Sequence, residues 1–139
     1  MIIRPFDEFD THALLGLASS FATSFAVSEQ RFRSSLRAVL ADDSACLRVA
    51  QSEDGALAGY LLGFAHHTFY ANGRVAWVEE IMVSEAGRRR GTGTLLMESF
   101  EQWALDRECR LIALATRRAA HFYEAIGYGE SATYFRKLL

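Results

Sequence analysis

The groups best suited to chemistry lie close together in residues 78–100, "VEEIMVSEAGRRRGTGTLLMESF". Glu79 and Glu80 place two adjacent carboxylates in an apolar run, and three arginines then precede Gly91, Gly93 and a helix-like segment. A turn that leads from a strand into a helix exposes unpaired N–H groups, which together with the helix dipole bind phosphate oxygens. Glycines let an anion approach the backbone and permit the positive φ that points successive N–H groups into one concavity. The stretch therefore indicates an anion-binding loop that follows a pair of carboxylates.

Two well-known phosphate-binding loops do not fit "RRRGTG". A Walker A loop requires Gly-Lys-Ser/Thr, which is absent here. A dinucleotide-binding fingerprint requires a third glycine and a place within a βαβ unit, but the third glycine is missing and the preceding strands do not form such a unit. A solvated basic turn, whose glycines only end one element and begin the next, explains the spacing equally well. The loop alone leaves both interpretations open.

Composition excludes several classes of protein. Half of the 139 residues are apolar, which suffices for one core, so we expect a single domain over residues 1–139. A formal net charge of -2 and a pI near 6.1 give no reason to expect nucleic acid or a membrane as partner. Cys46 and Cys109 have no metal-ligand spacing, so we expect reduced thiols and no metal. With no export signal in "MIIRPFDEFD", these features favour the cytoplasm.

Hydrophobic periodicity predicts the elements that position these groups. Strands are predicted at 2–6, 45–51, 56–70, 75–83, 110–116 and 128–139, and helices at 7–22, 28–42, 93–108 and 117–127. Ser28 is the expected N-cap of the second helix. The order indicates a mixed α/β fold of the α+β type, in which four helices cover a mostly antiparallel sheet of about six strands.

On two motifs the chain resembles the GNAT N-acetyltransferase superfamily. In that family a strand runs into an R/Q-x-x-G-x-G/A loop and a helix, and "RRRGTG", residues 88–93, is similar to it directly after "IMV". The family's later helix, with A-x-x-FY-x-x-x-GF, resembles "AAHFYEAIGY" at residues 119–128, and "SATYFRKLL" is similar to its closing strand. The element order is also the family's. The resemblance thus covers essentially the whole chain and implies a sheet that splays between its fourth and fifth strands.

The resemblance implies acetyl-CoA as cosubstrate. Backbone amides of residues 89–94 would hold its pyrophosphate, and backbone groups of Ile81 and Val83 would pair with the pantetheine arm as an added strand does. The family often has Asn just before the last helix, where this chain has Thr116, whose hydroxyl would take over the contact. The implied cofactor-binding residues are Ile81, Met82, Val83, Arg88, Arg89, Arg90, Gly91, Thr92, Gly93, Thr94 and Thr116.

Acetyl transfer to an amine requires a base, because an alkyl ammonium with a pKa of ~10 must lose a proton before it attacks. Period-two alternation sends Glu79 and Glu80 to opposite faces of the strand unless a bulge intervenes. The resemblance favours Glu79, which shares parity with Ile81 and Val83, as the base. Glu80 then lines an acceptor pocket or is a surface charge, and a solvated strand face is the alternative for both.

The resemblance also implies an acid. Tyr123 matches the family tyrosine that protonates the leaving thiolate, although an isolated tyrosine would be interpreted as a core aromatic. A backbone N–H near Val83 would polarise the thioester oxygen. We therefore expect Glu79 and Tyr123 as the catalytic pair, acting by direct transfer in a ternary complex.

Acceptor specificity is expected from the loop between the first two helices and from "HHTFY". Phe21, Phe25, Phe69 and Tyr70 would form an aromatic wall, with a carboxylate as counter-charge for a small-molecule or peptide amine. The predicted substrate-binding residues are Phe25, Glu29, His67 and Glu80.

Two rival functions remain at this point. The same fold can hold an acyl-CoA as a non-catalytic sensor or interaction module, and the arginines at 88–90 with those at 117 and 118 can contact nucleic acid, although the net acidity argues against the latter. O-acetylation and a longer acyl donor fit the enzyme interpretation as well. Since family members are often dimers, a homodimer is a further expectation of the resemblance.

Overall fold

One mixed sheet organises the computed structural model, which describes residues 1–22 and 24–139. Its strands lie in the order β1-β2-β3-β4-β5, antiparallel as far as β4, with β5 parallel to β4. The strands are β1 (Ile2–Pro5), β2 (Ala45–Gln51), β3 (Leu57–Thr68), β4 (Gly73–Val83) and β5 (Ile112–Leu114). The predicted α+β class is confirmed, with five described strands in place of about six.

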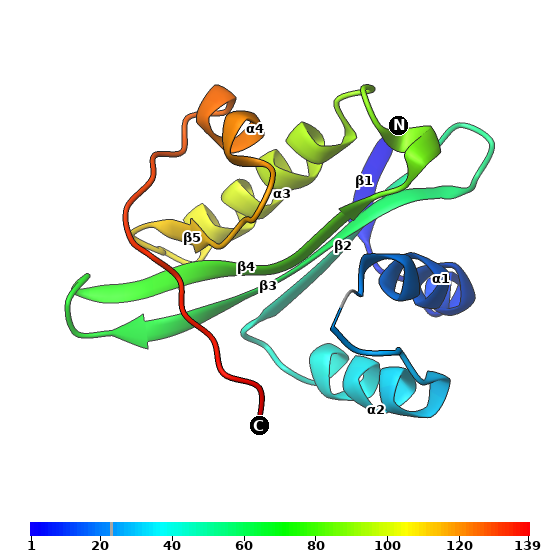
Figure 1. Ribbon diagram of the computed structural model, residues 1–139, viewed down its shortest axis with the longest axis horizontal. Coiled ribbons are helices and arrows are strands. Elements are labelled where there is room, and N and C mark those ends of the chain that lie inside the picture. Colours follow the sequence, from blue (N-terminus) through cyan, green and yellow to red (C-terminus); the bar gives the residue numbers. More distant parts are fainter. Residues whose placement is uncertain (23) are drawn as a thin grey trace.

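Helices cover both faces of the sheet (Figure 1). They are α1 (Thr11–Phe21) and α2 (Glu29–Leu40) on one face, and α3 (Thr92–Asp106) and α4 (Ala120–Ala125) on the other, with short 3-10 turns η1 (Glu8–Asp10) and η2 (Glu85–Gly87). The side chain of Ser28 accepts a hydrogen bond from the Arg31 N–H at 3.2 Å, which confirms the predicted N-cap of α2. Of the helices that the structure describes, none combines the length and apolar character needed to cross a membrane.

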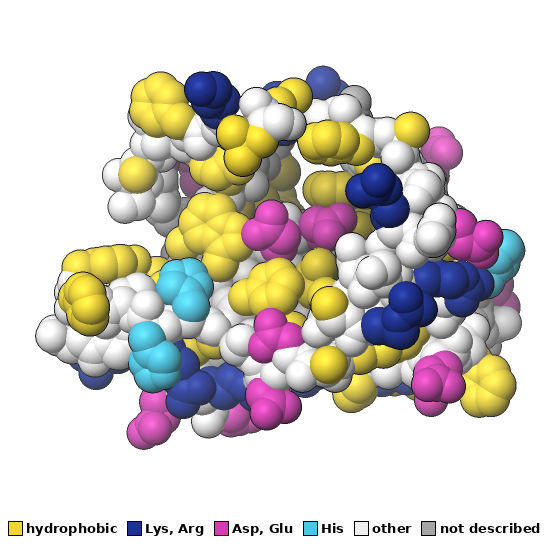
Figure 2. Space-filling model, turned by 90° about the horizontal axis from the view of Figure 1, so that it is seen from below, with side chains coloured by type: hydrophobic (Ala, Val, Ile, Leu, Met, Phe, Trp, Pro, Cys, Tyr) yellow, Lys and Arg dark blue, Asp and Glu magenta, His cyan; other side chains and the backbone are white. Residues whose placement is uncertain are grey.

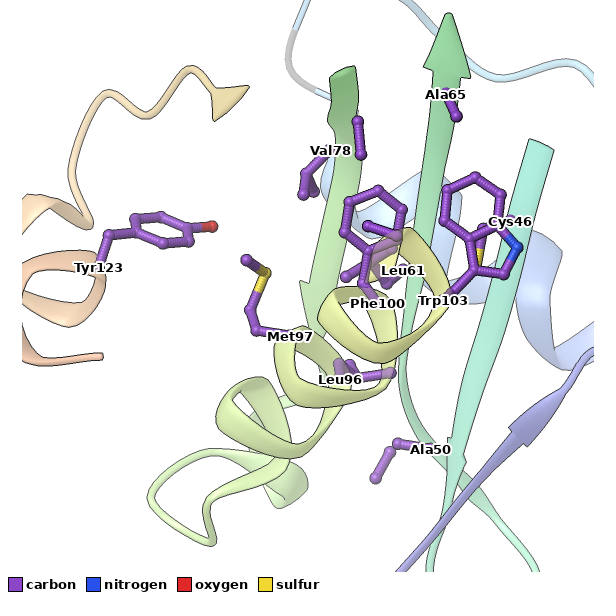
Figure 3. Packing of buried hydrophobic residues seen from close by; sticks show 13 residues of the cluster. Cys46, Ala50, Leu61, Ala65, Val78, Leu96, Met97, Phe100, Trp103 and Tyr123 are labelled. Carbon is purple, nitrogen blue, oxygen red and sulfur yellow. The ribbon is translucent and has the colours of Figure 1, made fainter. Parts of the chain in front are cut away.

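The core between α3 and the sheet is the larger of two. Leu96, Met97 and Phe100 of α3 are fully buried, and the Phe100 ring stacks on Trp103 with centroids 5.3 Å apart (Figure 3). Each such side chain stabilises the fold by roughly 1.5–3 kcal/mol on burial. A Cβ on Gly63 would overlap the Phe100 ring, so glycine at this position lets α3 lie directly against β3. This packing fixes the start of α3, and with it the loop at residues 88–93.

The layer of α1 and α2 packs less completely. Leu14 and Ala18 of α1 are buried against Val49 and Tyr60 of the sheet. No side chain of α2 is fully buried, and its apolar residues Phe32 and Leu36 are only partly covered. The incomplete packing leaves a cleft between α1, α2 and the sheet.

A β-bulge interrupts β4 at the two carboxylates. Leu62 of β3 pairs with Glu80, whereas the next residue of β3, Gly63, pairs with Val78, so Glu79 is an extra residue in β4. Val78 before the bulge and Ile81 after it both belong to the α3 core, because the alternation of faces shifts by one residue between them. The bulge is the exception that the predicted alternation allowed for, so a shared odd number does not place Glu79 on the face of Ile81. The role of Glu79 stays a prediction.

The prediction of a strand at residues 128–139 is wrong. Residues 129 to 139 are all exposed, Phe135 at 86%, and the segment crosses the molecule without forming a strand (Figure 1). Arg136 donates to the Ser24 hydroxyl at 3.0 Å. An alternating sequence defines the two faces that a strand would have, but it supplies no neighbouring strand, and β5 offers an edge of only three residues.

The ion pair between Arg4 of β1 and Asp10 should contribute to the stability of the fold. The two terminal guanidinium nitrogens of Arg4 donate to the Asp10 carboxylate, at 2.7 and 2.9 Å, and the Asp7 N–H donates to it at 2.8 Å. The hydrogen bond from Arg4 holds the pKa of Asp10 below its usual value. We expect Asp10→Asn to lower the free energy of unfolding by about 1–3 kcal/mol at pH 7, measured by urea denaturation.

The pH dependence has a defined sign. Because the folded-state pKa of Asp10 is lowered, its stabilisation is present above the unfolded pKa of 3.8 and is lost as the pH falls through the folded-state value. The parent should therefore lose stability faster than Asp10→Asn on acidification below about pH 5. Asp43→Asn, an exposed acid in the turn before β2, serves as the control; an equal loss in both variants would contradict the prediction.

Candidate active site

The loop before α3 offers a row of backbone donors. Arg88 donates its N–H back to Ser84, at 3.1 Å, whereas from residue 89 to residue 94 no N–H finds an acceptor in the part of the chain that the structure describes. Arg89 and Gly91 have positive φ values of 61° and 74°, so the backbone reverses here. The three arginine side chains are exposed around it. These free N–H groups at the start of a 15-residue helix fit a pyrophosphate.

Two side chains of the loop have other roles than contact with an anion. The Thr92 hydroxyl is buried and donates to the Gly87 carbonyl at 2.9 Å, so only the backbone of Thr92 can reach a ligand. A Cβ on Gly93 would lie 3.2 Å from the ring of Phe122, whereas one on Gly91 would meet open space. Gly91 is thus needed for its left-handed backbone and Gly93 for the approach of α4.

An open strand edge leads away from this loop. β5 pairs with β4 only at Ala76, Trp77 and Val78, and from residue 79 to Val83 β4 is bonded to β3 alone within the described residues. The predicted splay between the fourth and fifth strands is thereby confirmed. The free edge at Ile81, Met82 and Val83 can accept an extended chain such as a pantetheine arm through backbone hydrogen bonds.

Tyr123 of α4 reaches toward this edge from the α3 side. Its ring is buried, edge-on to Phe122 and Tyr128, and its hydroxyl points from α4 toward β4 (Figure 3). Every fully buried side-chain polar atom in the described structure has a partner, and the Tyr123 hydroxyl has none there, so this oxygen keeps some exposure to solvent. Burial of the ring raises the pKa of Tyr123, which keeps the hydroxyl protonated at neutral pH.

Thr116 stands at the turn before α4. Its hydroxyl accepts a hydrogen bond from the Ala119 N–H at 3.0 Å and is exposed, so its own hydrogen is available to a ligand. The predicted contact of Thr116 with a cofactor arm is compatible with this position and stays a prediction.

Glu80 is the carboxylate that the fold encloses. It is half-buried, and it accepts a hydrogen bond from the Tyr60 hydroxyl at 3.0 Å, while Glu79 beside it is exposed. Burial raises the pKa of Glu80, the nearby charge of Glu79 raises it further, and the hydrogen bond from Tyr60 opposes both. A carboxylate with a raised pKa is a stronger base than one in water.

Glu80 is one of the residues that line the cleft between α1, α2 and the sheet. The cleft has a volume of about 380 Å³, and Figure 2, which views this side of the molecule, shows a hollow with hydrophobic walls and acidic side chains at its border. Its lining residues are mostly apolar: Leu14, Ala18, Ala22, Phe25, Ala26, Val27, Phe32, Leu36, Val39, Leu47 and Leu62, with Ser28, Arg31, Ser35, Tyr60 and Glu80 as the polar members.

The cleft contains only part of the predicted acceptor site. Phe25 and Glu80 line it, but Glu29 and His67 do not: Glu29 is exposed and bound to Arg33 at 3.2 Å, and His67 is exposed near the end of β3. The prediction of an aromatic wall is wrong, because Phe69 and Tyr70 are exposed to solvent at the β3–β4 turn. The loop that should carry specificity includes residue 23, which lies outside the described residues.

Tyr60, the hydrogen-bond partner of Glu80, is not among the predicted site residues. The signal that identifies it is the antiparallel pairing of β3 with β4: Tyr60 and Leu62 alternate onto one face, and Leu62 pairs with Glu80. Tyr60 is almost fully buried, at 3% exposure, and its hydroxyl is held in place by Glu80.

Neither the cysteines nor the acids form a metal site in the described residues. Cys46 and Cys109 are both free, and burial raises the pKa of the Cys46 thiol to about 11. This thiol therefore stays protonated and is a poor nucleophile.

With this geometry in place, comparison with known proteins decides the family. The model of the acetyltransferase (GNAT) family matches residues 14–128. The chain belongs to the GNAT acetyltransferase family. GNAT proteins are N-acetyltransferases that depend on an acyl-CoA, which agrees with the loop of free N–H groups and the open edge of β4.

Individual relatives of this GNAT protein are distant. Glucosamine 6-phosphate N-acetyltransferase 1 from Oryza sativa subsp. japonica is 29% identical over 133 residues, which span 92% of this chain and 81% of that protein. Glucosamine-6-phosphate N-acetyltransferase from Arabidopsis thaliana superimposes with a TM-score of 0.88 at 18% identity, over 99% of this chain and 97% of that one. The apo aminoglycoside 6'-N-acetyltransferase from Acinetobacter haemolyticus superimposes with a TM-score of 0.80 at 23% identity, over 100% of this chain and 99% of that one. The solved structures establish the shared fold.

Proposed function

We propose that the protein transfers an acetyl group from acetyl-CoA to a primary amine by direct attack in a ternary complex. One observation carries the proposal: a half-buried carboxylate and an open tyrosine hydroxyl approach the unpaired stretch of β4 from opposite faces of the sheet, next to a loop of free N–H groups. Relatives named for glucosamine 6-phosphate and aminoglycosides support an amine as acceptor.

The residues of the chain divide the proposed reaction between them. The loop at residues 89–94 and the edge at Ile81 and Val83 would bind acetyl-CoA, which supplies the acetyl thioester. Glu80 takes a proton from the ammonium of the acceptor and releases it to solvent, and the free amine nitrogen bonds to the acetyl carbon. As the carbon–sulfur bond breaks, the nitrogen loses its second proton to Glu80, which passes it to solvent as well. Tyr123 gives its proton to the leaving sulfur and regains one from solvent. Of the two predicted carboxylates, we favour Glu80 because it is enclosed and held by Tyr60, whereas Glu79 is exposed.

The first test is calorimetric binding of acetyl-CoA, with Gly91→Glu and Gly91→Gln side by side. Both variants strain the left-handed backbone at residue 91 by about 1–2 kcal/mol, but only Glu adds a negative charge where the pyrophosphate would lie. We expect Gly91→Glu to weaken binding at least about tenfold more than Gly91→Gln. Equal affinities in the two variants would contradict the placement of the pyrophosphate.

The rival function is an acyl-CoA-binding module without turnover. Release of free thiol from acetyl-CoA over a panel of primary amines separates the two. The enzyme proposal requires thiol release that depends on the amine, and binding of acetyl-CoA with no release above the buffer rate for any amine would favour the module.

A further inference from the structure

The residues that line the cleft indicate which kind of acceptor can bind there. Most of its wall is aliphatic or aromatic, and Phe25 in that wall keeps 70% of its surface exposed. Covering apolar surface of this kind is favourable by about 25 cal/mol per Å². The cleft thus has an apolar wall that an apolar ligand would cover.

The polar groups of the cleft are few, and some of them are already hydrogen-bonded within the protein. The Ser28 hydroxyl already accepts the Arg31 N–H, and the Tyr60 hydroxyl is bound to Glu80. A sugar brings several hydroxyl groups, and each would be buried at a free-energy cost unless it found a partner. Ser35, Arg31 and Glu80 keep polar capacity for a ligand, while Ser28 keeps its own hydroxyl hydrogen and Tyr60 keeps an acceptor lone pair. These few polar side chains lie among eleven apolar ones, so the cleft suits an apolar body better than an amino sugar.

The charges in the cleft allow one ammonium group. Among the described residues, Glu80 is the single carboxylate in the lining, and it lies in the part of β4 that β5 leaves unpaired. Arg31, on α2, is the single cation in the lining and would repel a second positive charge on the ligand. A volume of about 380 Å³ is larger than an amino group requires and falls in the range of small-molecule sites.

We propose that the acceptor is a small monoamine with an apolar body, of the arylalkylamine type, whose body fills the cleft between α1, α2 and the sheet while its amine meets Glu80. This inference rests on the proposed function. It assigns specificity to the residues of the cleft wall, and among them to Phe25.

The experiment compares amines by thiol release from acetyl-CoA. The probes are 2-phenylethylamine, ethylamine and glucosamine 6-phosphate. We expect kcat/KM for 2-phenylethylamine to exceed that for each of the other two at least about tenfold, because filling an apolar pocket discriminates by this order. A higher kcat/KM for glucosamine 6-phosphate or ethylamine would overturn the inference and leave the proposed function standing. No release with any amine would overturn the proposed function, and the inference with it.

A pair of matched variants locates the apolar body. Ser35 lines the cleft from α2, and Ser34 beside it is exposed and lies outside the lining. We expect Ser35→Trp to lower kcat/KM for 2-phenylethylamine at least about tenfold with unchanged affinity for acetyl-CoA, and Ser34→Trp to leave both unchanged. Thermal unfolding of both variants verifies that they fold. Equal kcat/KM values in folded Ser35→Trp and in the parent would remove the amine from this cleft.

Discussion

The Tyr123→Phe variant is expected to turn over at least about 100-fold more slowly than the parent while binding acetyl-CoA with the same affinity. The substitution removes one oxygen and keeps the ring, whose edge-on contacts with Phe122 and Tyr128 hold it in place. The lost oxygen has no hydrogen-bond partner among the described residues, so its removal leaves no buried group unsatisfied. Burial raises the pKa of Tyr123, so the parent supplies a proton across the neutral range.

The measurements are steady-state thiol release and calorimetric binding of acetyl-CoA. Tyr128→Phe is the matched control, because it also removes a phenol oxygen beside the same ring, but one that donates to Glu101 at 2.8 Å. We expect that variant to lose stability and keep most of its turnover. If Tyr123→Phe turns over as fast as the parent, another group must protonate the leaving thiolate.

The second large effect is expected at Glu80. Glu80→Gln should lower kcat/KM at least about 100-fold, because the amide keeps the size of the side chain and a contact with Tyr60 but cannot accept a proton. The carboxylate is the active form, so kcat/KM of the parent should rise with pH through the pKa of Glu80. Burial raises that pKa, which moves the acid limb of the profile above the ordinary value of 4.5. In Glu80→Gln the limb should disappear.

Glu79→Gln distinguishes the two carboxylates. The charged and titratable groups around Glu80 are Tyr60 on β3, Glu79 on β4 and Arg31 across the cleft on α2. Removal of the negative charge of Glu79 should lower the pKa of Glu80, so the acid limb should move to lower pH while the maximal rate is kept. A 100-fold loss in Glu79→Gln with little change in Glu80→Gln would instead restore Glu79 as the base.

Much of the fold could be predicted because its determinants are local. Ser28 caps α2, the alternation over residues 45–51 gives β2 at the predicted bounds, and "RRRGTG" leads from β4 into α3. Motifs of this kind act through the backbone of a few consecutive residues, so the sequence contains the whole signal.

The parts that could not be predicted depend on residues distant in the sequence. The bulge at Glu79 exists because β3 and β4 pair with unequal residue counts, which period-two alternation in one strand does not reveal. Tyr60 belongs to the site only because its hydroxyl binds Glu80 on another strand. The segment 128–139 alternates as a strand does, yet the described chain supplies no edge for it.

The extra residue in β4 adds a second carboxylate beside Glu80 without changing the faces on which its neighbours lie. With Glu79 present, the strand supplies Val78 and Ile81 to the same core and still directs Glu80 into the cleft. Because Glu79 has no partner residue on β3, a chain without it would have a regular ladder in which Val78 and Ile81 still face the α3 core and Glu80 still faces the cleft. The negative charge of Glu79, which raises the pKa of Glu80, would then be missing. The extra residue therefore sets the charge beside the proposed base, whereas the side-chain pattern of the strand sets the face on which that base lies.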